Sequence, residues 1–127
     1  MIAVDTSALM TVVLGEPQAL ACVEAFAEAS EIVISAATVT EALIVATRRG
    51  VGEAMSALFD RLPMTVTVVD EDAARRAADA HGRWGKGRHT ARLNYGDCFA
   101  YEVAQRYGCP LLFVGDDFAQ TDIQSAL

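Results

Sequence analysis

The 127-residue sequence has few cysteines and no long apolar run. Its three cysteines, Cys22, Cys98 and Cys109, are odd in number and widely spaced, which argues against a disulfide framework or a zinc knuckle and fits a reducing cytoplasm. We expect all three to be small buried side chains. No apolar stretch reaches the roughly 18 residues of a membrane span. The N-terminus, Met1 to Asp5, lacks the basic region of a secretory signal.

Basic residues are scarce and unevenly distributed. The net charge of −7 alone speaks against a nucleic-acid-binding protein, because contacts to phosphates need cations. However, six of the ten basic residues fall between Arg75 and Arg92, together with both histidines, His81 and His89, and a single acid, Asp79. Such an asymmetry can mark an interaction surface on an otherwise acidic protein.

The remaining composition, 53% apolar and 21% charged, suits one packed domain over residues 1–127. Strands are predicted at 2–4, 32–34, 66–69 and 111–114, with a weak fifth strand near Ile123. Helices are predicted at 6–14, 17–28, 52–62, 70–84 and 94–107, and another helix is capped by Ser35 or Thr38 and ends near Arg49. Because strands alternate with helices, we expect a three-layer α/β/α domain with a mostly parallel sheet of four to five strands.

Acidic residues end several strands or open several helices. Asp5 ends the first strand, Asp116 and Asp117 follow the fourth, and Glu41 and Asp97 lie early in two helices. A parallel sheet gathers the carboxyl ends of its strands at one edge, so we expect these carboxylates to meet there. Clustered carboxylates raise each other's pKa unless a cation intervenes, and oxygen-only ligands suit Mg²⁺ or Mn²⁺. Such an ion can activate a water and orient a phosphodiester.

Each acid also has a purely structural interpretation. Asp5 could cap the helix that follows it, and Asp97 could form a capping box with Asn94. Glu41 could pair with Arg48 or Arg49, and the two adjacent aspartates after the fourth strand could be ordinary turn residues. If every acid had only its structural role, all of them would meet at one edge of the sheet by coincidence. A shared cation site is therefore the stronger hypothesis.

Four motifs in order, together with a glycine-rich basic loop, resemble a known family. They are VDTSAL at 4–9, Glu41, NYGDC at 94–98 and LFVGDDF at 112–118, with the loop WGKGRH at 84–89 before the third acid. Over nearly the whole chain they resemble the PIN-domain ribonucleases, and specifically the VapC toxins of bacterial toxin–antitoxin pairs. A DTSAL sequence at the start would by itself be weak evidence for this family, whereas the four motifs in the same order are strong evidence for it.

The resemblance implies Mg²⁺- or Mn²⁺-dependent endonucleolytic cleavage of RNA, often structured RNA such as tRNA. It also implies a homodimer that is neutralised by a small VapB-type antitoxin. The implied catalytic acids are Asp5, Glu41, Asp97 and Asp117, with Asp116 beside them as the alternative fourth acid. The implied metal ligands are Asp5, Asp97 and Asp117. The residues expected to contact substrate or support the site are Thr6, Ser7, Lys86, Arg88 and His89.

Other functions fit parts of the pattern. A catalytically silent binding module could use the same acids to hold a structural ion or a partner's basic side chains, and a nuclease assay with metal titration separates it from the enzyme. A metal-free ribonuclease could use His81 and His89 as an acid–base pair, although the carboxylates are better organised. A phosphoacceptor receiver domain would need a lysine after a late strand, whereas Lys86, the only lysine, lies in a predicted loop.

Overall fold

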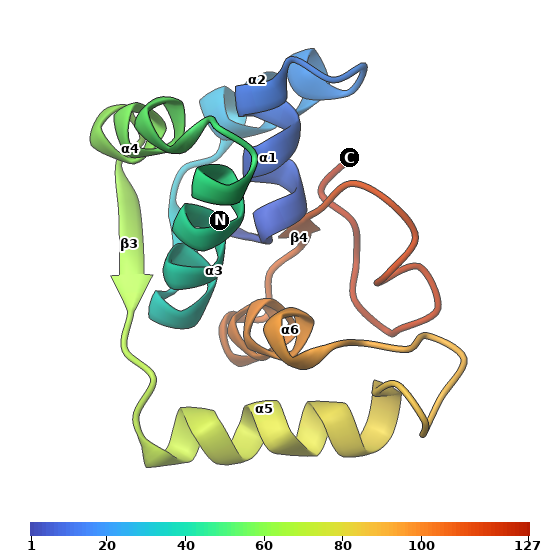
Figure 1. Ribbon diagram of the computed structural model, residues 1–127. Helices are drawn as coiled ribbons and strands as arrows, with labels where there is room; N and C mark the ends of the chain where they lie inside the picture. Colours follow the sequence, from blue (N-terminus) through green and yellow to red (C-terminus); the bar gives the residue numbers. More distant parts are fainter.

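The computed structural model describes all 127 residues and places a parallel sheet between two groups of helices (Figure 1). The strands are β1 (Ile2–Val4), β2 (Ile32–Ser35), β3 (Met64–Thr67) and β4 (Leu111–Leu112), in the order β3-β2-β1-β4. The helices are α1 (Thr6–Leu14), α2 (Ala19–Glu28), α3 (Ala36–Arg48), α4 (Gly52–Arg61), α5 (Glu71–Trp84) and α6 (Tyr95–Tyr107). The predicted three-layer α/β/α arrangement is confirmed.

Alternate residues of the central strands face two separate cores. Ile2 and Val4 of β1 pack against helices α1 to α4, whereas Ala3 packs on the opposite side, against α5 and α6. Ile34 and Val33 of β2 divide in the same way. Because both faces of the sheet are covered, its central strands are apolar throughout, which explains the continuous apolar runs in the sequence.

Two strands are placed or sized differently from the prediction. β3 begins at Met64 and ends at Thr67, because Thr67 pairs with Ser35, the last residue of β2. The Ser35 hydroxyl then caps α3 by accepting a hydrogen bond from the Ala37 N–H at 3.2 Å, so the chain of β2 turns away and leaves Val68 without a partner strand.

β4 is shorter than predicted, because only its two residues Leu111 and Leu112 pair with β1, at Ala3 and Val4. The prediction of a weak fifth strand near Ile123 is wrong, because the C-terminal segment forms only a single bridge, between Ser125 and Leu111. The consequence for the site is that β1 and β4 end side by side, and the chain leaves both strands at the same edge of the sheet.

The cysteines are all free, as expected, but only two of them are fully buried. Cys22 and Cys98 lie in the two cores, whereas Cys109 is half-buried, which corrects the expectation for that residue. No single helix is long and apolar enough to cross a membrane, and α1 and α2 reach the required length and composition only as a pair bent by 119°.

Candidate active site

Asp5 is the residue at which β1 ends and α1 begins. Its backbone N–H donates to the Leu112 carbonyl of β4 at 3.0 Å, which fixes the two strand ends together. Its Oδ2 accepts hydrogen bonds from the N–H of Ser7 at 3.0 Å and from the Ser7 hydroxyl at 2.6 Å. The other oxygen, Oδ1, is buried and has no hydrogen-bond partner. Asp5 is therefore a helix cap, as one interpretation expected, yet half of its carboxylate remains an unused buried acceptor.

The two hydroxyl side chains after Asp5 hold neighbouring groups in place. The Ser7 hydroxyl accepts a hydrogen bond from the Val114 N–H at 3.0 Å, which ties α1 to the segment that follows β4. The Thr6 hydroxyl donates to Glu41 Oε1 of α3 at 2.5 Å. Thr6 and Ser7 thus orient two of the acids, while their expected contact with a substrate stays a prediction.

Glu41 lies against the first turn of α6. A methyl group at Gly96 would overlap the Glu41 carboxylate, so only glycine lets the helix and this side chain approach so closely. Neither Arg48 nor Arg49 forms an ion pair with Glu41, so that structural interpretation is wrong. Sequence reasoning missed Gly96, and its position beside Asp97 in the NYGDC motif was the only available signal.

Asp97 opens α6 in a capping box with Asn94. The Asp97 N–H donates to Asn94 Oδ1 at 2.9 Å, and the Asn94 N–H donates to Asp97 Oδ2 at 3.0 Å. The capping interpretation is therefore correct. It accounts for the orientation of Asp97 but not for the burial of a carboxyl group that is only 6% exposed.

Burial and neighbouring charges perturb both buried aspartates. Burial raises the pKa of Asp97 to about 7, and the charges of Asp5, Asp117 and Glu41 raise it as well, against the lowering effect of the hydrogen bond from Asn94. Burial raises the pKa of Asp5 to about 6, opposed by its hydrogen bonds from Ser7 and aided by the charges of Glu41 and Asp117. The structure thus brings four of the five predicted acids together.

The loop after β4 contributes one of its two aspartates to this cluster. Asp117 acts on the pKa values of both Asp5 and Asp97, whereas Asp116 is not among the charges that shift either of them. Phe118 is buried beside Phe113, with 5.1 Å between the ring centroids, and anchors the loop. Of the two adjacent aspartates, only Asp117 raises the pKa values of the two buried acids.

The donor set of the acid cluster (Asp5, Glu41, Asp97 and Asp117) fits a hard divalent cation. All its donors are carboxylate oxygens, and Asp5 Oδ1 is a buried acceptor with no other partner. No three His, Cys, Asp or Glu side chains converge closely enough to enclose an ion by themselves. Mg²⁺ usually keeps several waters and takes only one or two carboxylates directly, so an open arrangement of this kind suits it.

The basic residues of the 75–92 segment divide into two groups. The three arginines of α5 form ion pairs with carboxylates. Lys86, Arg88 and Arg92, in the loop that joins α5 to α6, form no ion pair and line a hollow without apolar side chains. Arg92 has a φ of 57°, a left-handed conformation that is rare for a residue other than glycine. The loop is therefore the part of this segment whose cations are available to an anionic ligand.

The two histidines do not form a pair. His89 packs edge-on against Trp84, with 4.8 Å between the ring centroids, and its Nδ1 accepts a hydrogen bond from the Ala91 N–H at 2.9 Å. His81 instead faces α6 across a separate pocket. The arrangement offers no acid–base dyad, while the expected contact of His89 with phosphate stays a prediction.

Comparison with known proteins identifies similar sequences over the whole domain. A family model described as the PIN domain matches residues 2–124. Ribonuclease VapC36 of Mycobacterium tuberculosis is 44% identical over 126 residues, which cover 95% of this chain and 90% of that protein. A ribonuclease VapC of Mycolicibacterium smegmatis is 40% identical over 123 residues, which cover 94% of this chain and 95% of that protein.

Solved structures share the fold at lower identity. The Mycobacterium tuberculosis toxin VapC20, described as cleaving the sarcin–ricin loop, superposes with a TM-score of 0.78 at 19% identity over 97% of this chain and 96% of that one. A toxin–antitoxin complex from Klebsiella pneumoniae gives a TM-score of 0.74 at 18% identity, over 100% of this chain and 98% of that one. At these identities the similarity establishes the fold alone.

The close approach of Gly96 and Glu41 can be tested by stability. Gly96→Ala is expected to raise the free energy of unfolding less than alanine normally does in a helix, because the added methyl group must push aside the Glu41 carboxylate, the flexible end of that side chain. Gly82→Ala is the matched control, since Gly82 lies in α5 with open space around it, and it is expected to raise stability by about 0.5–1 kcal/mol. Urea unfolding measures both.

A second comparison assigns the effect of Gly96→Ala to this contact. In a Glu41→Ala background Gly96→Ala is expected to raise the stability as much as Gly82→Ala does, because the overlapping carboxylate is gone. Equal effects of Gly96→Ala with and without Glu41 would contradict the packing described here.

The raised pKa values of Asp5 and Asp97 predict that the difference in stability between the wild type and Asp97→Asn depends on pH. Between about pH 4 and pH 7 the folded protein keeps protons on Asp5 and Asp97 that the unfolded chain has released. The contribution of these two groups to the free energy of unfolding is therefore fully present below pH 4 and is lost as the pH rises to about 7. Asn at position 97 has no proton to lose. The stability of metal-free Asp97→Asn relative to the wild type is therefore expected to increase over this interval, by on the order of 1–2 kcal/mol after allowance for solvent screening.

Chemical denaturation at several pH values, in the presence of a chelator, measures this difference. A constant difference from pH 4 to pH 7 would show that Asp97 titrates normally.

Proposed function

The chain belongs to the PIN domain family, and from this membership and the acid cluster we propose that it is a Mg²⁺- or Mn²⁺-dependent endoribonuclease, the toxin of a toxin–antitoxin pair. Residues 1–127 form one domain that hydrolyses phosphodiester bonds in RNA, structured RNA such as tRNA among its candidate substrates. The observation that carries the proposal is Asp5 Oδ1, a buried and unpartnered carboxylate oxygen among three further acids.

The four acids divide the chemical work. Asp5, Asp97 and Asp117 would hold the cation, and Asp5 would supply the oxygen that has no other partner. When bound, the ion lowers the pKa of a water and offsets charge on the phosphate and the leaving oxygen. Glu41, fixed by the Thr6 hydroxyl, would take a proton from the water as its oxygen bonds to phosphorus, and the oxygen that leaves phosphorus would take a proton from solvent.

Supporting residues keep these acids in position without neutralising them. Ser7 holds one oxygen of Asp5 and leaves the other free, and Asn94 orients Asp97 through the capping box. Hydrogen bonds of this kind fix direction, while the charge remains available for a cation. Asp117 is preferred to Asp116 as the fourth acid, because only Asp117 acts on the pKa values of Asp5 and Asp97.

RNA binding to an acidic protein requires a local source of positive charge. Lys86, Arg88 and Arg92 provide it, because they form no ion pair and share one hollow in the α5–α6 loop. His89 stabilises the same loop through Trp84 and contributes its outer edge to phosphate contact. The cation bound by the acids reduces the remaining repulsion of the substrate.

A protein partner is part of the proposal. Among the structural neighbours are a toxin–antitoxin complex from Klebsiella pneumoniae and VapBC2 of Rickettsia felis bound to a promoter DNA fragment. We propose that a VapB-type antitoxin inhibits this chain, with a basic side chain that competes with the metal at the carboxylates. Leu20 and Val23 of α2 are 69% and 46% exposed, which suits a surface that becomes covered in a homodimer or in this complex.

We also propose that the protein acts in the cytoplasm.

A catalytically silent module remains the second candidate, because the same acids could hold a structural ion or a partner's basic groups. The absence of three converging ligand side chains is the observation that favours it. The nuclease assays below distinguish the two functions.

Asp97→Asn is expected to reduce RNA cleavage by about 100-fold or more, because it removes several kcal/mol of charge stabilisation from the transition state. Asparagine keeps an oxygen acceptor for the Asn94 N–H, so the fold is expected to survive. Asp60→Asn, an exposed position on α4, is the control that removes one negative charge elsewhere. Cleavage of a defined RNA by the purified, antitoxin-free variants measures the effect.

Metal removal extends this prediction. EDTA is expected to stop cleavage, and added Mg²⁺ or Mn²⁺ to restore it. Full activity in EDTA would refute the metal dependence, and a folded protein that cleaves no RNA with either metal would favour the silent module.

Charge reversal in the α5–α6 loop is expected to weaken RNA binding. The double variant Lys86→Glu with Arg88→Glu removes two phosphate contacts, so the affinity should fall and its dependence on salt should become shallower by about 1–2 units of slope. The double variant Arg48→Glu with Arg49→Glu changes the net charge equally at the far end of α3. If both variants lose the same affinity, the loop is not the RNA surface.

A further inference from the structure

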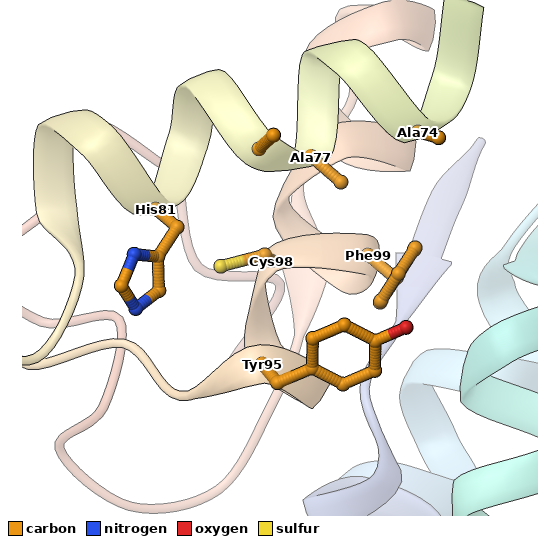
Figure 2. A pocket seen from close by; sticks show the side chains of 7 residues that line it. Ala74, Ala77, His81, Tyr95, Cys98 and Phe99 are labelled. Atoms are coloured by element: carbon orange, nitrogen blue, oxygen red, sulfur yellow. The ribbon is translucent and has the colours of Figure 1, made fainter. Parts of the chain in front are cut away.

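A second cavity, apart from the acid cluster, opens between α5 and α6 (Figure 2). It has a volume of about 430 Å³, within the range typical of small-molecule sites. Three alanines and His81 of α5 form one wall, and Tyr95, Cys98 and Phe99 of α6 form the other. The proposed reaction uses none of these side chains.

The lining of this pocket is apolar and aromatic, with one free polar group. The Tyr95 ring is 80% exposed and packs edge-on against Phe99, with 5.0 Å between the ring centroids. The His81 side chain forms no hydrogen bond within the protein, and Figure 2 shows it across the pocket from Cys98. The Cys98 thiol is already engaged, since it donates to the Asn94 carbonyl at 3.2 Å. A flat ligand could therefore stack on Tyr95 and receive or give one hydrogen bond at His81.

The pocket lies between the two charged parts of the proposed enzyme. Tyr95 is in the first turn of α6, two residues before Asp97, and Gly96 between them contacts the Glu41 carboxylate. On the other side, α5 ends three residues after His81 and continues into the loop of unpaired cations. A nucleotide whose phosphate lies between the cationic loop and the acid cluster would thus have its base beside this pocket.

We propose that the α5–α6 pocket binds one unpaired nucleobase of the RNA substrate, stacked on Tyr95 and hydrogen-bonded to His81. The assignment rests on the proposed ribonuclease function and adds a substrate requirement to it. A nucleobase matches the lining because it is flat and aromatic with polar edges, and the phosphate attached to it matches the cations nearby. Since a paired base is not free to enter, the enzyme should cut only where a nucleotide next to the scissile bond is unpaired.

Cleavage of modified oligonucleotides tests this directly. A pool of unstructured RNA oligonucleotides is incubated with the wild type and Mg²⁺, and the cut is mapped on the best substrate. Each nucleotide around the cut is then replaced by an abasic one. At one position the loss of the base is expected to lower kcat/KM about 5- to 150-fold, the range for one base stacked on an aromatic ring.

Tyr95→Ala gives the decisive comparison. On intact RNA it should lose a similar factor, and on RNA that is abasic at the sensitive position it should lose almost nothing more, because ring and base act as a pair. Tyr107→Ala is the matched control, an exposed tyrosine at the other end of α6, and it should behave as the wild type on both substrates.

Filling the pocket provides a second variant that keeps Tyr95. Ala78→Leu adds a side chain at an exposed wall position and should lower cleavage of intact RNA but not of the abasic RNA. Ala54→Leu, on exposed α4, is its control. Circular dichroism and thermal melting show whether each variant is folded.

The possible outcomes distinguish a failure of the ribonuclease function from a failure of the base site alone. If the wild type cleaves no RNA, the ribonuclease function fails and the base site fails with it. If the wild type cleaves but no abasic position matters, or Tyr95→Ala keeps the full abasic effect, only the base site is overturned. A change in the mass of the assembly by Tyr95→Ala, without a change in the abasic effect, would make the pocket an interface between copies of the chain and also overturn it.

Discussion

The burial of two carboxyl groups, Asp5 and Asp97, beside two further acids is the constraint on which this structure depends. Removal from water and mutual repulsion both disfavour the charged forms of Asp5 and Asp97, whose pKa values rise to about 6 and about 7. The surrounding groups offset part of this cost with hydrogen bonds from hydroxyl and backbone donors, but none of them carries a positive charge. A divalent cation would relieve the repulsion between the carboxylates, and it would also give the unpartnered Asp5 Oδ1 a partner.

The same residues serve the fold and the site. Asp5 caps α1 and Asp97 completes the capping box of α6, so the structural interpretation of both acids is correct, and their proposed role as metal ligands uses the same side chains. In Asp5 the two roles use different oxygens, since Oδ2 accepts the capping bonds and Oδ1 is left over. Because Asp5 is the N-cap of α1 and Asp97 is the third residue of α6, the positions of these carboxylates follow from where α1 and α6 begin.

The sequence predicted the features that follow from chain order and missed those that follow from packing. Alternating strands and helices placed Asp5, Asp97 and the loop after β4 at one edge of the sheet, and the structure agrees. The resemblance already favoured Asp117 over Asp116, and the structure adds that only Asp117 acts on the pKa values of Asp5 and Asp97. The contact of Gly96 with Glu41 and the α5–α6 pocket depend on how two helices pack, which residue spacing does not encode.

A crystal structure of the antitoxin-free protein grown with Mn²⁺, analysed through the anomalous signal of the metal, tests the cation site most directly. The expected result is an anomalous peak at the acid cluster, with Asp5 Oδ1 bonded to the ion or linked to it through one water. A map at saturating Mn²⁺ with no peak near Asp5 and Asp97, or with peaks only on other surfaces, would contradict a metal site built from these four acids.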